Sequence, residues 1–296
     1  MSPKVSIVVP CYNHERFVGK LIESIYSQTF KDFELTVLDD GSKDNSPQIL
    51  KALAEKYKFK LIIKENEGIC KTLNRGIELS RGEFFIAIAS DDFIPTNRLQ
   101  EQVSFLETHP SVDVVAGSLI VVDNDGNELG PKKPKIQGPI SFDQMLEINR
   151  VLAATVMMRR SVFQRFGSYG EGHVFEDYHM WLKILKNGGS IANTNNMWAY
   201  YRVSNPDLEK KFNWYYKGMV QALNDYKDIK IAQKSILKQR MIYSIKLTLL
   251  IGKEFFTRYA EVIHELNVTQ RLFLRCISFV PKFIRHFSLK VLKLKT

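Results

Sequence analysis

Short apolar runs alternate with helical patterns along the first hundred residues, and this alternation limits the chain to few folds. Between the runs, apolar residues recur every three to four positions, as in a helix with one buried face. Such alternation predicts an α/β fold, a Rossmann-like, mostly parallel sheet with helices on both faces. The expected strands are 5–10, 33–38, 60–63 and 84–88, and the expected helices begin near residues 17, 46, 69 and 97.

After residue 110 the pattern changes. A strand over 112–122 and a second strand after Asn127 are joined by Asp125-Gly126, which is typical of a hairpin turn. A further strand is expected over 151–158, and a helix over 176–186. Beyond Tyr201 the chain is expected to be helical to its end, in about four segments.

Composition is that of an ordinary globular protein, with 45% hydrophobic and 25% charged residues among 296. This excludes collagen-like, low-complexity and wholly disordered classes. Three cysteines at wide spacing support neither a disulfide framework nor a zinc site, so a reducing cytoplasm is expected. No secretory signal and no spanning helix are expected, because no uncharged apolar run reaches about 18 residues.

Two adjacent carboxylates end each of two predicted strands. Ligands of parallel sheets bind beyond the carboxyl ends of the strands, so Asp39-Asp40 and Asp91-Asp92 are site candidates. Asp91-Asp92 suits Mg²⁺ or Mn²⁺ shared with nucleotide phosphates. Taken alone, Asp91 is better interpreted as a helix N-cap, and only the other motifs favour the metal. Asp39-Asp40-Gly41 could bind a base or a ribose, or form a plain turn.

A third carboxylate pair, Glu176-Asp177, opens a predicted helix. The simplest interpretation is an acidic first turn stabilised by the helix dipole. The alternative is a general base that accepts a proton from a hydroxyl nucleophile. The Glu176-x-x-His179 pattern is weak as a metal motif. The calcium-loop pattern at Asp123 lacks its twelfth-position acid, so a hairpin turn is favoured there.

Taken in order, these segments resemble the family 2 glycosyltransferases of the GT-A fold over roughly the first 200 residues. The resemblance rests on joint order and spacing, since each motif alone is weak. It divides the chain into a nucleotide-sugar glycosyltransferase domain, 1–205, and a helical region, 206–296. The motifs are Val5-Ser-Ile-Val-Val-Pro-Cys-Tyr-Asn13, Ser27-Gln-Thr-Phe30, Val37-Leu-Asp-Asp-Gly-Ser42, Asn66-Glu-Gly68, Asn74-Arg-Gly76, Arg81-Gly-Glu83, Ser90-Asp-Asp92 and Glu176-Asp177.

The resemblance implies a UDP-sugar donor, a divalent cation (Mn²⁺ or Mg²⁺) and inversion at the anomeric carbon. It implies that Asp92 binds the metal, that Asp91 faces the ribose or metal, and that Asp177 is the catalytic base with Glu176 beside it. It also implies that Pro10, Tyr12 and Asp39 line the uridine pocket, with Asp39 facing the uracil N–H. Three further residues would lie near the nucleotide: Asn66, Gly68 and Lys71.

Two departures from the family pattern affect the phosphate site. Ala89 stands where many relatives have the first Asp of Asp-Ser-Asp-Asp, so one potential metal carboxylate is missing. Ser204 stands where many relatives have a His, so Arg202 or a lysine is expected to serve the pyrophosphate. The Gln-x-x-Arg-Trp signature of processive synthases is absent, which favours a single-addition transferase.

The excess of basic over acidic side chains lies entirely in the last third of the chain. Residues 1–200 have 23 basic and 25 acidic side chains, whereas residues 201–296 have 19 basic and 7 acidic. Apolar and cationic residues at helical spacing over 270–296 favour a helix on an anionic membrane surface. The alternative, a helix packed on the protein, competes most strongly over 213–251. No nucleic-acid partner is expected, because no binding motif accompanies the charge.

Together these features predict an inverting glycosyltransferase at the cytoplasmic face of the plasma (inner) membrane, held there peripherally. The expected acceptor is a lipid-linked, undecaprenyl-diphosphate saccharide of O-antigen, lipopolysaccharide or capsule biosynthesis. A non-catalytic or weakly active membrane-associated relative of the same fold is the main alternative. A sugar nucleotidyltransferase is less favoured, because residues 10–19 lack a Gly-rich phosphate loop. The sequence patterns do not indicate the donor sugar, the linkage or the oligomeric state.

Overall fold

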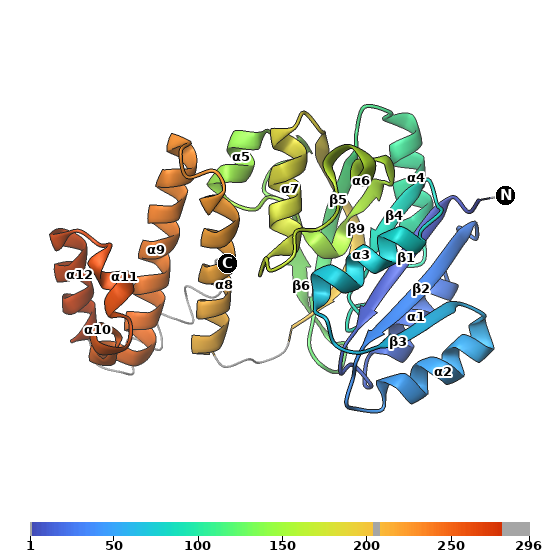
Figure 1. Ribbon diagram of the computed structural model, residues 1–296, viewed down its shortest axis with the longest axis horizontal. Helices are drawn as coiled ribbons and strands as arrows, with labels where there is room; N and C mark the ends of the chain where they lie inside the picture. The colour runs from blue at the N-terminus through green and yellow to red at the C-terminus, as the bar shows by residue number, and fades with distance from the viewer. Residues whose placement is uncertain (1, 204–207, 280–296) are drawn as a thin grey trace. The chain divides into compact units, whose positions relative to one another are not determined.

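The computed structural model describes residues 2–203 and 208–279 (Figure 1). The chain forms two compact units, residues 1–204 and 205–296. Ser204 and the final segment 280–296 lie outside the described residues, so the expectations placed on them have no structural counterpart here.

The first unit is built on one sheet in the order β3-β2-β1-β4-β8-β5-β9-β7, with β6 paired to β5. β1 pairs in parallel with both β2 and β4, β2 with β3, and β5 with β9. β8 runs antiparallel between β4 and β5. The strands are β1 Val5–Cys11, β2 Phe33–Asp40, β3 Lys60–Lys64, β4 Phe84–Ala87, β5 Val114–Val122, β6 Glu128–Lys132, β7 Gly138–Pro139, β8 Met157–Arg159 and β9 Ile191–Arg202.

Helices cover both faces of this sheet, as the alternation predicts. Side chains of α1, α2 and α4 share one buried core with Ile7 and Leu35, and α3 contacts the strands from the other face, where Gly76 lies against Val8. The helices are α1 Val18–Tyr26, α2 Ser46–Tyr57, α3 Ile69–Leu79, α4 Arg98–Thr108, α5 Phe142–Glu147, α6 Ser161–Phe166 and α7 Glu176–Lys186.

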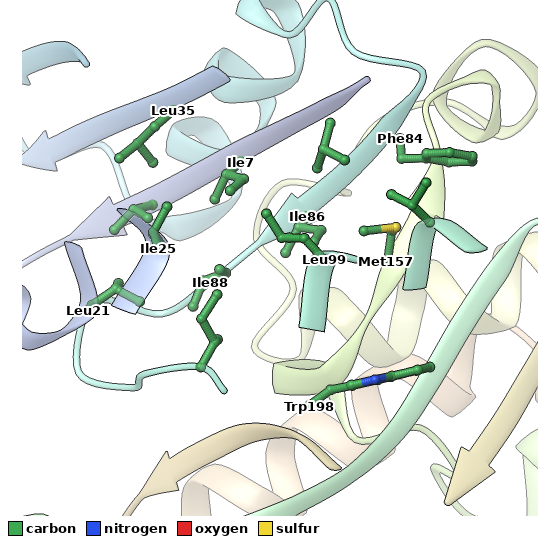
Figure 2. Close-up of a cluster of buried hydrophobic side chains, with 14 of the residues drawn as sticks. Ile7, Leu21, Ile25, Leu35, Phe84, Ile86, Ile88, Leu99, Met157 and Trp198 are labelled. Atoms are coloured by element: carbon green, nitrogen blue, oxygen red, sulfur yellow. The ribbon is translucent and has the colours of Figure 1, made fainter. Parts of the chain in front are cut away.

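The main core follows from the two-residue period of the central strands (Figure 2). Ile7 of β1 and Ile86 of β4 are register neighbours, and they point to the same face as Leu35 of β2. Leu21 and Ile25 of α1 are wholly buried against this face. Odd-numbered positions of β2 therefore face α1, and even-numbered positions face α3.

The strand expected over 151–158 is wrong in its first half. Residues Ala153–Thr155 form a short 3-10 helix (η1), and only Met157–Arg159 form a strand. Arg98 explains the change, because its buried guanidinium donates to the carbonyls of Ala154 and Val156. Thr155 Oγ1 in turn donates to Leu152 O and accepts from Gly117 N. These bonds replace the ladder that an extended segment would form.

The second unit is helical over its described residues and has a core of its own. Phe212, Tyr243, Leu247, Phe255 and Leu274 are among its buried members. No helix among the described residues has the length and apolar character that crossing a membrane requires. The elements are α8 Leu208–Asn224, α9 Lys230–Ile251, the 3-10 turn η2 Gly252–Glu254, α10 Phe255–Arg258, α11 Ala260–His264 and α12 Val268–Ser278.

Two glycines provide a matched test of packing. A Cβ at Gly82 would lie 2.5 Å from Ser6 N, whereas a Cβ at Gly19, inside α1, would meet nothing within 4 Å. We expect Gly82→Ala to lower the free energy of unfolding by about 1–3 kcal/mol through overpacking. Gly19→Ala should raise it by about 0.5–1 kcal/mol through helix propensity. Urea unfolding measures both, and equal effects would contradict the packing at Ser6.

Candidate active site

A cavity of about 290 Å³ lies beyond the carboxyl ends of β1, β2 and β4. This is the sheet edge that the strand–helix alternation singles out for ligands. Four sequence-predicted residues, Pro10, Tyr12, Asn66 and Gly68, line the cavity. The full wall consists of Pro10, Cys11, Tyr12, His14, Asp40, Asn66, Gly68, Ile69, Thr72, Ala89 and Ser90.

The carboxylate in the cavity wall is Asp40, and not the predicted Asp39. Neighbouring residues of a strand point to opposite faces, so Asp39 follows Leu35 and Val37 toward α1. Asp39 is fully buried, and its Oδ1 accepts a hydrogen bond from Ser42 N at 3.1 Å. Asp40, and not Asp39, therefore lines this cavity, while the contact of Asp39 with a base stays a prediction.

Asp40 shapes the loop that closes one side of the cavity. Its carboxylate accepts hydrogen bonds from the Glu67 and Gly68 amides at 3.0 Å and pairs with Lys64. Burial opposes ionisation, but the Lys64 and Glu67 hydrogen bonds outweigh it and lower the pKa of Asp40. Gly68 has a φ of 88° at the start of α3, a backbone conformation that favours glycine.

Asp92 is a buried carboxylate with one oxygen unsatisfied. Its Oδ1 accepts from Arg202 N at 2.9 Å, while Oδ2 is buried without a hydrogen-bond partner. Burial and the negative charge of Asp91 raise the pKa of Asp92 to about 8, although Arg98 and Arg202 act in the opposite direction. An unpartnered buried carboxylate oxygen is costly, and a cation would relieve that cost.

Asp91 is more accessible than Asp92 and lies next to the cavity wall. Its Oδ1 is 4.0 Å from His14 Nδ1, which is hydrogen-bonded to Ser90 Oγ at 2.7 Å. Asp91 is not the N-cap of the following helix, because α4 begins after Asn97. Two adjacent carboxylates with a free buried oxygen fit a hard divalent cation, so the donor set agrees with the expected Mg²⁺ or Mn²⁺. Asp91 and Asp92 would hold it.

Arg202 does not have the contacts expected of a pyrophosphate ligand. Its side chain is buried and donates to backbone carbonyls, from Nε to Asp91 O at 2.8 Å and from Nη1 to Asp123 O and Asn124 O at 2.6 and 2.7 Å. In the structure Arg202 therefore makes structural contacts with the Asp91 segment, and direct phosphate binding by Arg202 stays a prediction. Lys71, the other predicted cation, is exposed on α3.

Glu176 and Asp177 form a half-buried acidic pair at the start of α7. Asp177 Oδ1 accepts from Tyr178 N at 2.6 Å. Burial, together with the charge of Asp177, raises the pKa of Glu176 to about 7, and burial raises that of Asp177. Both carboxyl groups therefore keep protons at higher pH than exposed carboxyls do.

The charges of the acidic pair act on two further side chains, Tyr201 and Cys70. Burial and the charges of Asp92, Asp91 and Asp177 raise the pKa of Tyr201 to about 12, so its phenol is within electrostatic range of all three. Cys70 follows the cavity residue Ile69 and donates to His173 O at 3.9 Å. Glu176 and Asp177 are outside the cavity wall itself.

Sequence reasoning named the Asp39-Asp40 pair but missed His14 and Tyr201 as site residues. Position alone could have found His14, which follows the strand end at Pro10. Within the Asp39-Asp40 pair, the alternation of buried positions at Leu35 and Val37 could have assigned Asp40, rather than Asp39, to the cavity wall. Tyr201 has no local signal, because its proximity to the carboxylates depends on the pairing of β9 with β5.

Comparison with known proteins identifies relatives throughout the first unit. The family model described as glycosyl transferase family 2 matches residues 6–167. The putative glycosyltransferase EpsE of Bacillus subtilis is 32% identical over 207 residues, 68% of this chain and 73% of EpsE. WfgD of Escherichia coli, named as a UDP-Glc:alpha-D-GlcNAc-diphosphoundecaprenol beta-1,3-glucosyltransferase, is 27% identical over 82% of this chain and 94% of WfgD. The chain spans about a third of two uncharacterized Rickettsia glycosyltransferases that it matches at 32% identity.

Solved structures share the fold. TarS 1–349 of S. aureus in complex with UDP-GlcNAc has a TM-score of 0.60 at 20% identity, covering 92% of this chain and 79% of that chain. The mannosyltransferase PcManGT of Pyrobaculum calidifontis, in complex with GDP-Man and Mn²⁺, has a TM-score of 0.63 at 15% identity, covering 96% and 88%. The predicted GT-A fold with a helical extension is confirmed.

The buried Asp92 carboxyl makes stability depend on pH. Its pKa is about 8 in the folded chain and about 4 when unfolded, so the folded state retains a proton that the unfolded state has lost between these values. Wild-type stability should therefore fall as pH rises through this window. We expect Asp92→Asn to melt above wild type at pH 8, by about 2–4 °C for each kcal/mol gained, and no higher near pH 4.

Asp32→Asn is the matched control, because Asp32 is exposed. It should leave the melting temperature unchanged at both pH values. Thermal unfolding followed by circular dichroism measures all three proteins. A gain in Asp92→Asn that is the same at pH 4 and pH 8 would contradict the buried charge.

Proposed function

The chain belongs to glycosyl transferase family 2, and on that premise we propose that it transfers a hexose or N-acetylhexosamine from a UDP-sugar to a hydroxyl group of a lipid-linked saccharide. The observation that carries the proposal is the cavity at the carboxyl ends of β1, β2 and β4, next to the Asp91-Asp92 pair. The transfer would invert the anomeric carbon, because one base on the acceptor side suffices for a single displacement.

The donor would occupy the cavity through its nucleotide. Asp40 offers a carboxylate to base or ribose donors, and the exposed ring of Tyr12 offers an apolar surface at the mouth. UDP-sugars are named for WfgD and for the TarS complex, which supports a UDP-sugar over other donors. A GDP-sugar is the competing class, since PcManGT binds GDP-Man.

Asp91 and Asp92 would hold Mn²⁺ or Mg²⁺ against the diphosphate. When bound, the ion would neutralise charge on the leaving diphosphate. The chain's own contribution is to fix the carboxylates, because the Arg202 amide holds Asp92 Oδ1 and leaves Oδ2 free. His14 and Ser90 add hydrogen-bonding groups beside Asp91.

Asp177 would act as general base. Its carboxylate would accept the proton of the acceptor hydroxyl as that oxygen attacks the anomeric carbon from the side opposite the diphosphate. A raised pKa makes Asp177 a stronger base than an exposed carboxylate, provided that it is ionised at the working pH. Glu176 would hold this pKa up through its own negative charge.

We further propose that the acceptor is presented at a membrane, as in undecaprenyl-diphosphate-linked O-antigen, lipopolysaccharide or capsule biosynthesis. WfgD is named for a diphosphoundecaprenol acceptor. In the described part of the basic segment, Leu272 and Phe273 on α12 are 57% and 50% exposed, and Arg275 is exposed beside them. An exposed apolar helix face with cations suits an anionic surface at the cytoplasmic side of the membrane.

Loss of the base should separate catalysis from binding. We expect Asp177→Asn to lower transfer by about 10²–10⁴-fold, because the hydroxyl proton has no acceptor, while UDP affinity persists. UDP release from a panel of UDP-hexoses with lipid-linked acceptors measures turnover, and calorimetry measures UDP binding. Turnover near wild type would exclude Asp177 as base, and no release from wild type with any donor would favour the non-catalytic alternative.

Glu176→Gln serves as the matched variant in a pH profile. In wild type, the acid limb of kcat/KM should lie above the usual aspartate range, because the base must lose a proton whose pKa is raised. Removing the negative charge of Glu176 should move that limb to lower pH. A limb that does not move would show that the two carboxyl groups are not coupled.

Vesicle flotation tests the membrane proposal. A chain ending at residue 269 should lose binding to vesicles that contain anionic phosphatidylglycerol, and Leu272→Asn with Phe273→Asn should weaken it. Leu237→Asn on α9 is the control, since Leu237 is equally exposed at 50%. Equal flotation of all variants would contradict the proposal. So would binding of the wild type to neutral phosphatidylcholine vesicles that equals its binding to the anionic vesicles.

A further inference from the structure

One side chain, Arg202, connects three segments that are far apart in the sequence. It lies at the end of β9, and its Nε and Nη1 bind carbonyls of the Asp91 segment and of the turn between β5 and β6. Its guanidinium also stacks on Phe17, just before α1, at 4.4 Å from the ring centroid. Its backbone amide holds Asp92 Oδ1.

The turn that Arg202 reaches is itself fixed. Asp123 accepts hydrogen bonds from the Asp125 and Asn127 amides, each at 2.9 Å, so the carbonyls of residues 123 and 124 are presented by a closed turn. Arg202 therefore connects the Asp91 segment, by its side-chain hydrogen bonds, to a turn that is itself closed by hydrogen bonds. A mobile turn would not fix the position of the guanidinium.

Arginine is the side chain that fits these acceptors. A planar guanidinium donates in several fixed directions, whereas a lysine ammonium is a single flexible point charge. The stack on Phe17 further restricts the plane of the group. Removing the donors would leave three carbonyl oxygens at a partly buried place without these hydrogen bonds.

We propose that Arg202 is a positioning residue for the metal and diphosphate site: it anchors the Asp91-Asp92 segment so that Asp92 Oδ2 and the Asp91 carboxylate face one cation together. This inference rests on the proposed function. A positioning role for Arg202 affects only the metal-dependent part of UDP affinity. Direct phosphate binding by Arg202 would also affect UDP affinity in the absence of metal.

Arg159 provides a matched control on the same sheet. It too is mostly buried and donates to three backbone carbonyls, from Nε to Val112 O and from Nη2 to Leu106 O and His109 O. It belongs to β8 and lines a different cavity, with Glu83 and Gln164. Arg159→Lys should destabilise the fold in the same way without changing the Asp91 segment.

The test is calorimetric titration of UDP into the full chain, with Mn²⁺ and with chelator, beside thermal unfolding. We expect Arg202→Lys to weaken Mn²⁺-dependent UDP affinity by about tenfold or more, as loss of an outer-shell partner does, and to leave metal-free UDP affinity unchanged. Arg159→Lys should lower the melting temperature comparably and leave both affinities unchanged. Phe17→Leu, a milder change, should weaken the Mn²⁺-dependent affinity by a smaller factor even if Arg202→Lys fails to fold.

Three results would overturn the inference. Equal Mn²⁺-dependent affinities in wild type, Arg202→Lys and Phe17→Leu would remove the positioning role. A loss of UDP affinity in Arg202→Lys that persists with chelator would assign Arg202 to direct phosphate contact. A similar loss in Arg159→Lys would reduce the effect to general destabilisation. Failure of wild type to bind UDP at all would instead refute the proposed function.

Discussion

Burying a carboxylate without a matching cation costs free energy, and the first unit does so repeatedly along one edge of its sheet. At Asp40 the cost is met within the chain by Lys64 and two loop amides. At Asp92 it is met only in part, because one oxygen has an amide and the other has no hydrogen-bond partner. At Glu176 and Asp177 the charges lie beside each other. Asp39 Oδ2 is likewise buried without a hydrogen-bond partner. The unsatisfied oxygen of Asp92 belongs to the proposed metal site, where a bound cation would offset the cost of its burial.

The sheet explains how these groups come together. β1, β2 and β4 run in parallel, so the segments that follow them meet at one edge and form the cavity. β9 returns along β5 and brings Tyr201 and Arg202 toward the Asp91 segment, where Phe93 and Tyr200 also pair through backbone hydrogen bonds. The donor side of the site thus depends on local strand ends, whereas the anchoring of Asp92 depends on a strand more than a hundred residues away.

The sequence predicts the strand ends on the donor side of the site better than it predicts the anchoring of Asp92. The helix expected to begin near residue 69 begins at Ile69 in the structure, because the apolar periodicity marks it. Strand parity, readable from the buried positions Leu35 and Val37, indicates that Asp40 and not Asp39 lines the cavity. Arg202 could not be assigned, because its partners are backbone carbonyls that carry no sequence signal. The missing half of the 151–158 strand has the same cause, since the Arg98 bonds arise only once the chain is folded.

The two units each enclose a separate set of buried side chains. A substitution inside one core therefore acts first on the packing of the unit that contains it.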